Sequence, residues 1–310
     1  MTNQITIIGS INVDRILHID QLPEAGETIS MTDLTLAAGG KGANQAIAAV
    51  RSGAQTNFIG AVGNDADGIF MLEQMTKNGI NTEGIQTVHH QPTGQAYILL
   101  QASGQNSIVI SSGANACVDA DLVAQNQKLL STSDFVITQS ETPESAAIAG
   151  FKLAHSAGAT TILNPAPASK ISAELLSLTD IIVPNETESQ TITGIEYTGH
   201  NSLLWMSKYF HERGVKAVII TLGSTGSYLS FAGQNKIIPA NKVKAVDTTA
   251  AGDTFIGSFA SELKTDFSNI EQAMQYDTTA SGLAVQKLGA FPSIPTRTQI
   301  MDYLNSNEDK

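Results

Sequence analysis

Short runs of β-branched and aliphatic residues alternate along the chain with longer segments in which apolar residues recur every three or four positions. In residues 42–51, for example, Ala43, Ala46, Ile47 and Val50 fall on one helical face. This alternation predicts an α/β fold: a doubly wound, mostly parallel sheet flanked by helices. We expect strands at residues 5–8, 58–62, 135–138, 161–163, 181–183 and 218–222, a hairpin at 227–231 and 236–239, and helices at 42–51, 68–78, 120–130, 143–157, 203–213, 254–263, 269–288 and 296–305.

Two segments interrupt the alternation. Residues 18–36 look extended and rich in turns, and residues 93–100 and 107–111 look like a hairpin. Since neither has a helix to cover a second face, together they predict a small antiparallel β lid. Such a sheet can close over a site, pair two subunits, or be an ordinary surface excursion. The expected core comprises residues 1–12, 37–91 and 113–310, and the expected lid comprises residues 13–36 and 92–112.

Composition narrows the possible functions. The chain has 310 residues, of which 42% are hydrophobic, and a formal net charge of −12. Such a charge argues against nucleic acid as a partner, because nothing would neutralise a phosphate backbone. The apolar runs are shorter than the ~20 residues that span a bilayer, and no basic leader precedes the first strand, so we expect neither a membrane partner nor export. The lone Cys117 fits a reducing cytoplasm.

The segment Asp-Thr-Thr-Ala-Ala-Gly-Asp-Thr-Phe-Ile-Gly at 247–257 is the most informative one. Small side chains at Ala250, Ala251 and Gly252 would let an anion reach the unpaired N–H groups of a helix start. The carboxylate of Asp253 would repel a phosphate unless it had other work, such as accepting a proton from an attacking hydroxyl. The segment therefore suggests phosphoryl transfer to an alcohol. The alternative is an ordinary turn in which Asp253 is a helix N-cap.

Polar residues follow the ends of many predicted strands, where parallel sheets bind ligands. Asn12 and Asp14 alternate on an extended segment and can both face one side, as contact with vicinal hydroxyls requires, although turn formation at a strand end would also explain them. Fingerprints of a Rossmann site, an α/β-hydrolase and a zinc site are absent. Other strand ends are followed by the run Gly39-Gly-Lys-Gly-Ala-Asn44, by Glu141, by the run Asn185-Glu-Thr-Glu188, and by Gly223 after Thr221.

Five motifs, in order along nearly the whole chain, resemble those of one known family. The runs 39–46 and 247–255 are similar to the N-terminal and C-terminal signatures of the PfkB-type carbohydrate kinases. Residues 9–14, 164–168 and 185–188 stand in the order found in the ribose-phosphorylating branch of that family. The resemblance implies transfer of a phosphoryl group from ATP to the 5-hydroxyl of D-ribose, giving D-ribose 5-phosphate and ADP.

The resemblance also implies roles for individual residues. Asp253 would take the proton of the 5-hydroxyl, and the N–H groups of Ala250, Ala251, Gly252 and Asp253 would form an anion hole. The sugar would be held by Asn12, Asp14, Gly40, Lys41, Asn44, Glu141 and Asp253. ATP, with its Mg²⁺, would be held by Asn185, Glu188, Thr221, Gly223, Gly226, Gly252 and Thr278.

A monovalent-cation site and a homodimer are further implications of the resemblance. Bound K⁺ would shape the anion hole without touching the substrate. The lid would close over the sugar and pair two subunits, excluding water as a competing nucleophile. The cation would be held by Asp247, Thr249, Ala284, Lys287, Gly289 and Ser293.

Two departures from the family pattern affect the expected substrates. Ile256 stands where many relatives carry Asn, and a deoxyribose-phosphorylating branch carries Ile. Thr278 stands where Asn or His commonly meets adenine. Since Asn12 and Asp14 together offer a partner to each sugar hydroxyl, ribose remains the first expectation and deoxyribose the second. The sequence leaves two more functions open, namely a nucleoside kinase of the same family and a catalytically silent sugar-binding regulator.

Overall fold

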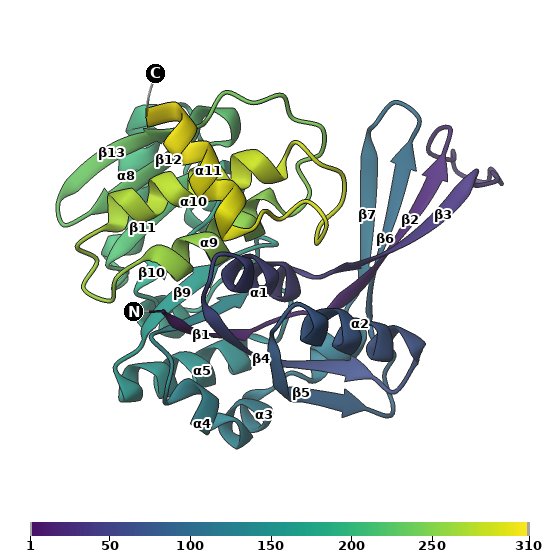
Figure 1. The fold of residues 1–310 in the computed structure, drawn as a ribbon, viewed down its shortest axis with the longest axis horizontal. Coiled ribbons are helices and arrows are strands. Elements are labelled where there is room, and N and C mark those ends of the chain that lie inside the picture. The colour runs from purple at the N-terminus through teal and green to yellow at the C-terminus, as the bar shows by residue number, and fades with distance from the viewer. Residues whose placement is uncertain (1, 309–310) are drawn as a thin grey trace.

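The computed structural model describes residues 2–308 and has the α/β architecture that the sequence predicts (Figure 1). Within those residues, a nine-stranded sheet has the order β13-β12-β11-β10-β9-β8-β1-β4-β5. The strands from β11 to β5 are parallel, and the antiparallel β12 and β13 complete one edge. These strands are β1 (Gln4–Ile8), β4 (Gln55–Gly63), β5 (Asn81–Val88), β8 (Phe135–Gln139), β9 (Thr160–Asn164), β10 (Ile181–Ile182), β11 (Ala217–Thr221), β12 (Gly226–Phe231) and β13 (Gln234–Pro239).

Helices cover both faces of the sheet, and alternate residues of its strands supply two hydrophobic cores. In β1, Ile5 and Ile7 pack with residues of α1, α2, α9 and α10, whereas Ile8 packs with α3, α5 and α8 on the other face. Burying each isoleucine contributes about 1.5–3 kcal/mol. The helices are α1 (Lys41–Arg51), α2 (Ala66–Lys77), α3 (Ala120–Gln125), α4 (Gln127–Leu130), α5 (Glu144–Ala157), α6 (Ala173–Ser177), α7 (Glu186–Thr193), α8 (His200–His211), α9 (Ala251–Glu262), α10 (Ile270–Ala284) and α11 (Arg297–Glu308).

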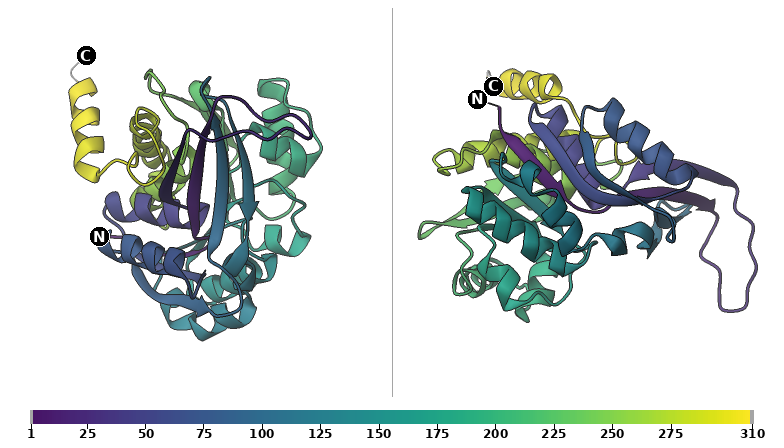
Figure 2. Two further views of the ribbon diagram at one scale, coloured as in Figure 1. Left: turned by 90° about the vertical axis from the view of Figure 1, so that its right-hand side faces the viewer. Right: turned by 90° about the horizontal axis from the view of Figure 1, so that it is seen from below.

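A separate four-stranded sheet projects from the core, as Figures 1 and 2 show. Its strands are β3 (Asp33–Gly39), β2 (Asn12–Ile19), β6 (Gly94–Gln101) and β7 (Asn106–Ser111), in that order. The β2–β3 and β6–β7 pairs are antiparallel, but β2 and β6 are parallel, so this lid is antiparallel only within its two halves. Because β2 begins shortly after β1 ends, the lid continues directly from a strand of the main sheet.

A few elements differ from those predicted. Residues 120–130 form two helices instead of one, because the chain breaks at Asn126, whose Nδ2 donates to the Leu122 carbonyl at 2.9 Å. Helix α10 ends at Ala284 and not at Leu288. The sequence pattern did not predict β5, whose mixed polar and apolar residues suit a partly exposed edge strand. Nor did it predict α6 and α7, which are too short to show a clear period.

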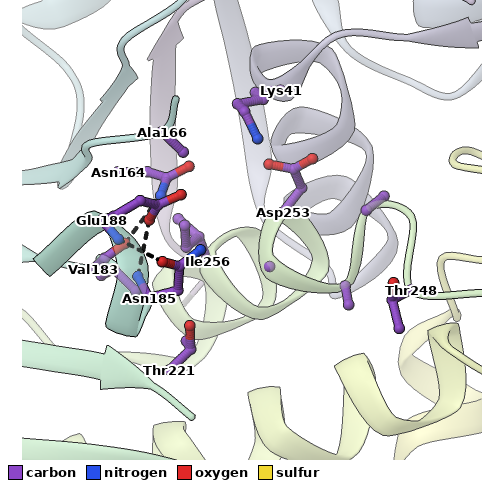
Figure 3. A pocket seen from close by; sticks show the side chains of 13 residues that line it. Lys41, Asn164, Ala166, Val183, Asn185, Glu188, Thr221, Thr248, Asp253 and Ile256 are labelled. Atoms are coloured by element: carbon purple, nitrogen blue, oxygen red, sulfur yellow. Dashed lines mark hydrogen bonds between the residues drawn. The ribbon is translucent and has the colours of Figure 1, made fainter. Parts of the chain in front are cut away.

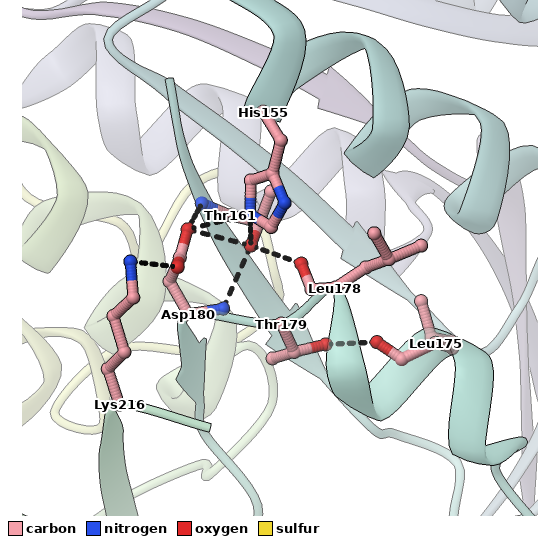
Figure 4. A network of polar contacts seen from close by, with 7 residues as sticks. All are labelled: His155, Thr161, Leu175, Leu178, Thr179, Asp180 and Lys216. Carbon is pink, nitrogen blue, oxygen red and sulfur yellow. Dashed lines mark hydrogen bonds and ion pairs between the residues drawn. The ribbon is translucent and has the colours of Figure 1, made fainter. Parts of the chain in front are cut away.

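A polar network ties together the amino ends of β9, β10 and β11 (Figure 4). The buried carboxylate of Asp180 accepts hydrogen bonds from the backbone N–H of Thr161 at 2.9 Å and from its hydroxyl at 3.1 Å. It also forms an ion pair with Lys216 at 2.8 Å. Burial alone would raise the pKa of Asp180, but these hydrogen bonds outweigh burial and hold the pKa below its usual value.

None of the helices within residues 2–308 is long and apolar enough to cross a membrane.

Candidate active site

The start of α9 combines a strained turn with an uncapped helix terminus. Its N-cap residue, Ala250, has a left-handed φ of 58°, which is strained for a residue other than glycine. No side chain among residues 2–308 caps this helix, so the N–H groups of Gly252 and Asp253 remain available to an anion, whereas the Ala251 N–H donates to the Thr248 carbonyl at 3.2 Å. Asp253 lies within the first turn and not at the cap, so the interpretation of Asp253 as an N-cap is wrong.

A cavity of about 200 Å³ opens at this helix start (Figure 3). Strand ends form its opposite wall: Asn164 ends β9, Thr221 ends β11, and Val183 follows β10. The ammonium of Lys41 and the carboxylate of Asp253 point into the same space. Six other predicted residues share the cavity: Asn185, Glu188, Thr221, Ala250, Ala251 and Gly252. The full lining is Lys41, Asn164, Ala166, Val183, Asn185, Glu188, Thr221, Thr248, Ala250, Ala251, Gly252, Asp253 and Ile256.

Two amides of α1 hold the carboxylate of Asp253, which is 7% exposed. Asn44 donates from Nδ2 to Oδ2 at 2.9 Å, and Gln45 donates from Nε2 to Oδ1 at 3.0 Å. Each carboxylate oxygen keeps a further lone pair, so the group can still accept a proton from a substrate hydroxyl. The buried Oδ1 of Asn44 has no hydrogen-bond partner within the described residues and is oriented as a spare acceptor.

Lys41 supplies a positively charged side chain to the site. Burial lowers the pKa of its ammonium, but neighbouring carboxylates more than reverse this, so the pKa ends above its usual value. Those carboxylates belong to Asp253, Glu141 and Glu188. Lys41 therefore remains fully charged at neutral pH, which suits a group that neutralises a transferred phosphate.

Asn12 and Asp14 lie at the base of the lid, on β2. Asn12 is 2% exposed, and its Oδ1 accepts from Asn115 Nδ2 at 2.8 Å, which leaves the Asn12 amide N–H groups to a ligand. Burial raises the pKa of Asp14 to about 7, with additional repulsion from Glu141 and Asp253. A Cβ at position 39 would collide with this carboxylate, so Gly39 makes room for it.

Glu141 joins the predicted sugar residues through the start of α1. Its Oε2 accepts from the Ser10 hydroxyl at 2.5 Å and from the backbone N–H of Lys41 at 3.2 Å. The N-cap residue Gly40 has a φ of 95°, and a Cβ there would lie 2.7 Å from the backbone nitrogen of Asn12. Only glycine fits this junction of lid and helix.

Asn185 and Glu188 form a reciprocal capping box at the start of α7. Asn185 Oδ1 accepts from the Glu188 N–H at 2.7 Å, and Glu188 Oε2 accepts from the Asn185 N–H at 2.9 Å. Burial is the main reason that the pKa of Glu188 is raised. The box fixes both side chains on the wall of the cavity opposite Asp253.

A second cavity, of about 320 Å³, lies on the other side of the α9 start. It shares Thr221, Thr248, Ala251 and Gly252 with the first cavity, so the two cavities are adjacent. Five predicted nucleotide residues line it, namely Thr221, Gly223, Gly226, Gly252 and Thr278. The remaining lining residues are Ser224, Ala240, Asn241, Val243, Ala245, Thr248, Ala251, Phe255, Ser281, Gly282 and Val285.

The predicted cation ligands come from two segments that meet beside the α9 start. Asp247 Oδ1 accepts from the N–H and hydroxyl of Thr249 at 2.9 and 2.6 Å, and its Oδ2 accepts from the Gly289 N–H at 2.8 Å. Burial would raise the pKa of Asp247, but these donors hold it below its usual value. The carboxylate thus stays ionised and ties residues 247–249 to the loop that contains Lys287, Gly289 and Ser293. Ala284 is the last residue of α10, directly before that loop.

Five buried polar residues support the predicted site residues, although no role was predicted for them from the sequence. All five contact a predicted site residue or its direct neighbour through side-chain hydrogen bonds. Ser10, Gln45 and Asn164 lie inside the quoted motifs 9–14, 39–46 and 164–168, so the motifs could have pointed to them. Asn115 and Gln139 carry no such local signal. The five are Ser10, Gln45, Asn115, Gln139 and Asn164.

Comparison with known proteins gives consistent matches. Residues 2–297 match the pfkB family of carbohydrate kinases. The chain is 44% identical over 301 residues to a ribokinase of Staphylococcus aureus, covering 97% of this chain and 99% of that protein. It is 47% identical over 306 residues to a bifunctional ribokinase/ribose-5-phosphate isomerase A of Fructilactobacillus sanfranciscensis, covering 98% of this chain but only 57% of that protein. The structure of Arabidopsis thaliana ribokinase complexed with ribose and ATP superposes with a TM-score of 0.92 at 34% identity, covering 98% of this chain and 99% of the other.

Proposed function

The chain belongs to the pfkB family of carbohydrate kinases, and we propose that it is a ribokinase, which transfers the γ-phosphoryl group of ATP to the 5-hydroxyl of D-ribose. The products are D-ribose 5-phosphate and ADP. The observation that carries the proposal is the Asp253 carboxylate at an uncapped helix start, facing a cavity shared with Lys41.

Asp253 acts as the general base. The 5-hydroxyl gives its proton to the carboxylate while its oxygen attacks the γ-phosphorus. The new O–P bond forms as the bond to the bridging oxygen of ADP breaks, and ADP leaves with that electron pair. The N–H groups of Ala250, Ala251, Gly252 and Asp253 form the anion hole for the charge on the transferred group.

The sugar binds between the lid and α1. Asn12 donates its free amide N–H groups, and Asp14 and the unpaired Oδ1 of Asn44 accept sugar hydroxyls. Because both Asn12 and Asp14 are present, the site favours a sugar with all its hydroxyls. The apolar side chain of Ile256 in the same cavity is the feature that favours 2-deoxyribose as the alternative. Gly40, Lys41 and Glu141 complete the sugar site.

ATP spans the two adjacent cavities. The second cavity, whose walls are mostly apolar, receives the base near Thr278, with Thr221, Gly223 and Gly226 beside it. Asn185 and Glu188 face the phosphates and the Mg²⁺ that accompanies them. Mg²⁺ supplies positive charge to the β- and γ-phosphates, and the acidic Glu188 beside amide oxygens suits a hard cation.

An activating K⁺ binds where residues 247–249 meet the loop after α10. One ionised carboxylate, from Asp247, and a set of backbone oxygens suit a large monovalent cation. The cation would be held by Asp247, Thr249, Ala284, Lys287, Gly289 and Ser293. It stiffens the turn that ends at Ala250 and thereby the anion hole.

The lid closes over the sugar and pairs two copies of the chain as a homodimer. Support comes from large apolar side chains that are exposed on it, among them Leu36, Ile108, Val109 and Ile110. A cytoplasmic location is part of the proposal, since a single free cysteine, Cys117, fits a reducing compartment.

An acceptor panel tests the function. Purified protein is mixed with Mg-ATP, K⁺ and, separately, D-ribose, 2-deoxy-D-ribose, D-fructose or adenosine, and ADP release is followed by a coupled assay. We expect the highest kcat/KM with D-ribose, and mass spectrometry with NMR should place the phosphate on O5. A higher kcat/KM for deoxyribose or adenosine would replace ribose as the substrate, and no ADP with any acceptor would overturn the kinase proposal.

A further inference from the structure

A chain of buried amides leads from the main sheet to the carboxylate of Asp253. Gln45, which is fully buried on α1, donates from Nε2 both to Asp253 Oδ1 at 3.0 Å and to Asn164 Oδ1 at 3.1 Å. Its own Oε1 accepts from Gln139 Nε2 at 2.7 Å. Asn164 and Gln139 end the neighbouring strands β9 and β8. Gln45 therefore lies between the reacting carboxylate and the rigid centre of the sheet.

The orientations of two of these three amides, Gln45 and Asn164, are fixed by hydrogen bonds at both ends. Asn164 Nδ2 donates to the backbone carbonyl of Val183 at 3.0 Å, so its Oδ1 must face Gln45. The ionised Asp253 can only accept, so Gln45 must present its NH₂ group there and its oxygen to Gln139. Neither amide can flip without placing two donors or two acceptors against each other. The hydrogen bonds of Gln45 and Asn164 therefore have a fixed donor–acceptor direction.

The backbone leaves room for these hydrogen-bonded amides at one position, Gly9. Gly9, which follows β1, lies so close to Gln139 that a Cβ would collide with the Gln139 side-chain oxygen. That oxygen is buried and has no hydrogen-bond partner within the described residues. Desolvating an amide oxygen without a partner costs free energy. The cost is consistent with a requirement to keep the Gln139 NH₂ group on Gln45.

We propose that Gln45 is a positioning residue for the reaction: it holds the Asp253 carboxylate in one plane, using Gln139 and Asn164 as anchors on the sheet. The inference rests on the proposed phosphoryl transfer. With Asn44 on Oδ2 and Gln45 on Oδ1, the carboxylate cannot rotate, and its remaining lone pairs point into the cavity. Misplacing a reacting group by about 1 Å can cost roughly 100-fold in rate.

Because several charged groups surround Asp253, the most informative substitution is one that leaves their charges unchanged. Lys41 on α1, Asp14 on β2 and Glu188 on α7 interact with it electrostatically, and Glu141 after β8 acts on Asp14 and Lys41. Replacing Gln45 by Met changes none of these charges and nearly preserves the side-chain volume. A change in the pH profile of this variant then reports the lost hydrogen bond and not a change in net charge.

The test compares Gln45→Met with wild type, using the acceptor that wild type phosphorylates fastest. We expect kcat to fall about 10- to 100-fold, the acid limb of the pH profile of kcat to move to higher pH, and the sugar KM to change less than about threefold. Gln139→Met, which leaves the donor to Asp253 but removes its anchor, should show a smaller decrease in the same direction. Thr138→Val is the matched control, because Thr138 is buried on β8 with an unpaired hydroxyl and lies outside this chain of amides.

Unchanged kcat and an unchanged acid limb in Gln45→Met would overturn the inference. A lower melting temperature with an unmoved acid limb would do the same, because it would assign Gln45 to packing alone. If Gln45→Met does not fold, Gln139→Met decides, and wild-type kinetics in that variant would contradict the inference. Because the acceptor is chosen by the wild-type enzyme, an error in the sugar assignment leaves the test valid, whereas a wild-type chain without any turnover would remove the proposed function and this inference together.

Discussion

At the scale of single residues, the buried carboxyl group of Asp14 in the site lowers the stability of the folded chain at neutral pH. Its carboxyl is 9% exposed, and burial, together with Glu141 and Asp253, raises its pKa from 3.8 to about 7. Between those two pH values the unfolded chain has released its proton and the folded chain has not. The contribution of Asp14 to the free energy of unfolding is therefore fully present below about pH 4 and is lost as the pH rises to about 7.

Replacing Asp14 by Asn should remove that loss. We expect the free energy of unfolding of Asp14→Asn, relative to wild type, to rise between pH 4 and 8 by up to about 4 kcal/mol, while sugar affinity falls. Urea unfolding at several pH values measures this, with the exposed Asp20→Asn as the control. Parallel stability curves for Asp14→Asn and wild type would contradict the assignment.

Residues of the site differ in how far the sequence could reveal them. Asn12, Lys41 and Asp253 follow glycine-rich turns or strand ends, where local spacing already points to ligands. Gln45 looks like one more helix residue, because its partner Asp253 lies 208 positions further along the chain. A contact of that range depends on how α1 packs against α9, which no local pattern specifies.

At the scale of elements, two segments far apart in sequence together shape the proposed anion hole. Asp247, just before the α9 turn, is joined to the loop after α10 by its hydrogen bond to the Gly289 N–H. The Val285 carbonyl accepts from the N–H groups of Val246 and Asp247 at 2.7 and 3.1 Å. These contacts hold the segment that leads into the turn at Ala250.

A dependence on K⁺ follows from the proposed cation site. We expect kcat to be higher in KCl than in NaCl at equal ionic strength, because carbonyl ligands held by a folded loop can favour one cation size over another. Asp247→Asn should weaken the preference. Equal rates in the two salts would count against the site.

The amino ends of β9, β10 and β11 depend on a different carboxylate, that of Asp180. Its pKa is lower when folded than when unfolded, so it stabilises the fold above about pH 4, and this contribution is lost as the pH falls below that value. We expect Asp180→Asn to lower the free energy of unfolding by about 1–3 kcal/mol at pH 7 and by less at pH 3. Chemical denaturation at both pH values measures this. A loss that does not depend on pH would contradict the account, and turnover of the folded variant should stay normal because the network lies outside both cavities.

At the scale of the whole molecule, the lid combines sugar residues at its base with apolar residues along its length. Ile16, Ile98 and Ile108 are in register across β2, β6 and β7, on the face that also carries Asp14. The sequence pattern predicted the hairpin of β6 and β7, but it placed the other extended lid segment at residues 18–36 and not at the bounds of β2 and β3. Nor did it predict the parallel pairing of β2 with β6, because helices α1 and α2 and two strands of the main sheet separate them along the chain. A half-exposed apolar row of this kind suits a second copy of the chain.

We expect Ile108→Lys to shift the chain from dimer to monomer, because a charge in the middle of an apolar interface must lose its water. Analytical ultracentrifugation measures the change, with Gln86→Lys, which adds the same charge on the exposed edge strand β5, as the control. A wild-type chain that is monomeric at high concentration would refute the homodimer.

The central claim is that Asp253 makes the sugar hydroxyl nucleophilic, and turnover of Asp253→Asn tests it most directly. We expect kcat with D-ribose to fall about 100- to 10,000-fold, the usual contribution of a general base, while calorimetry finds sugar affinity largely preserved. Turnover near the wild-type value would contradict the claim and remove Asp253 from the role of base.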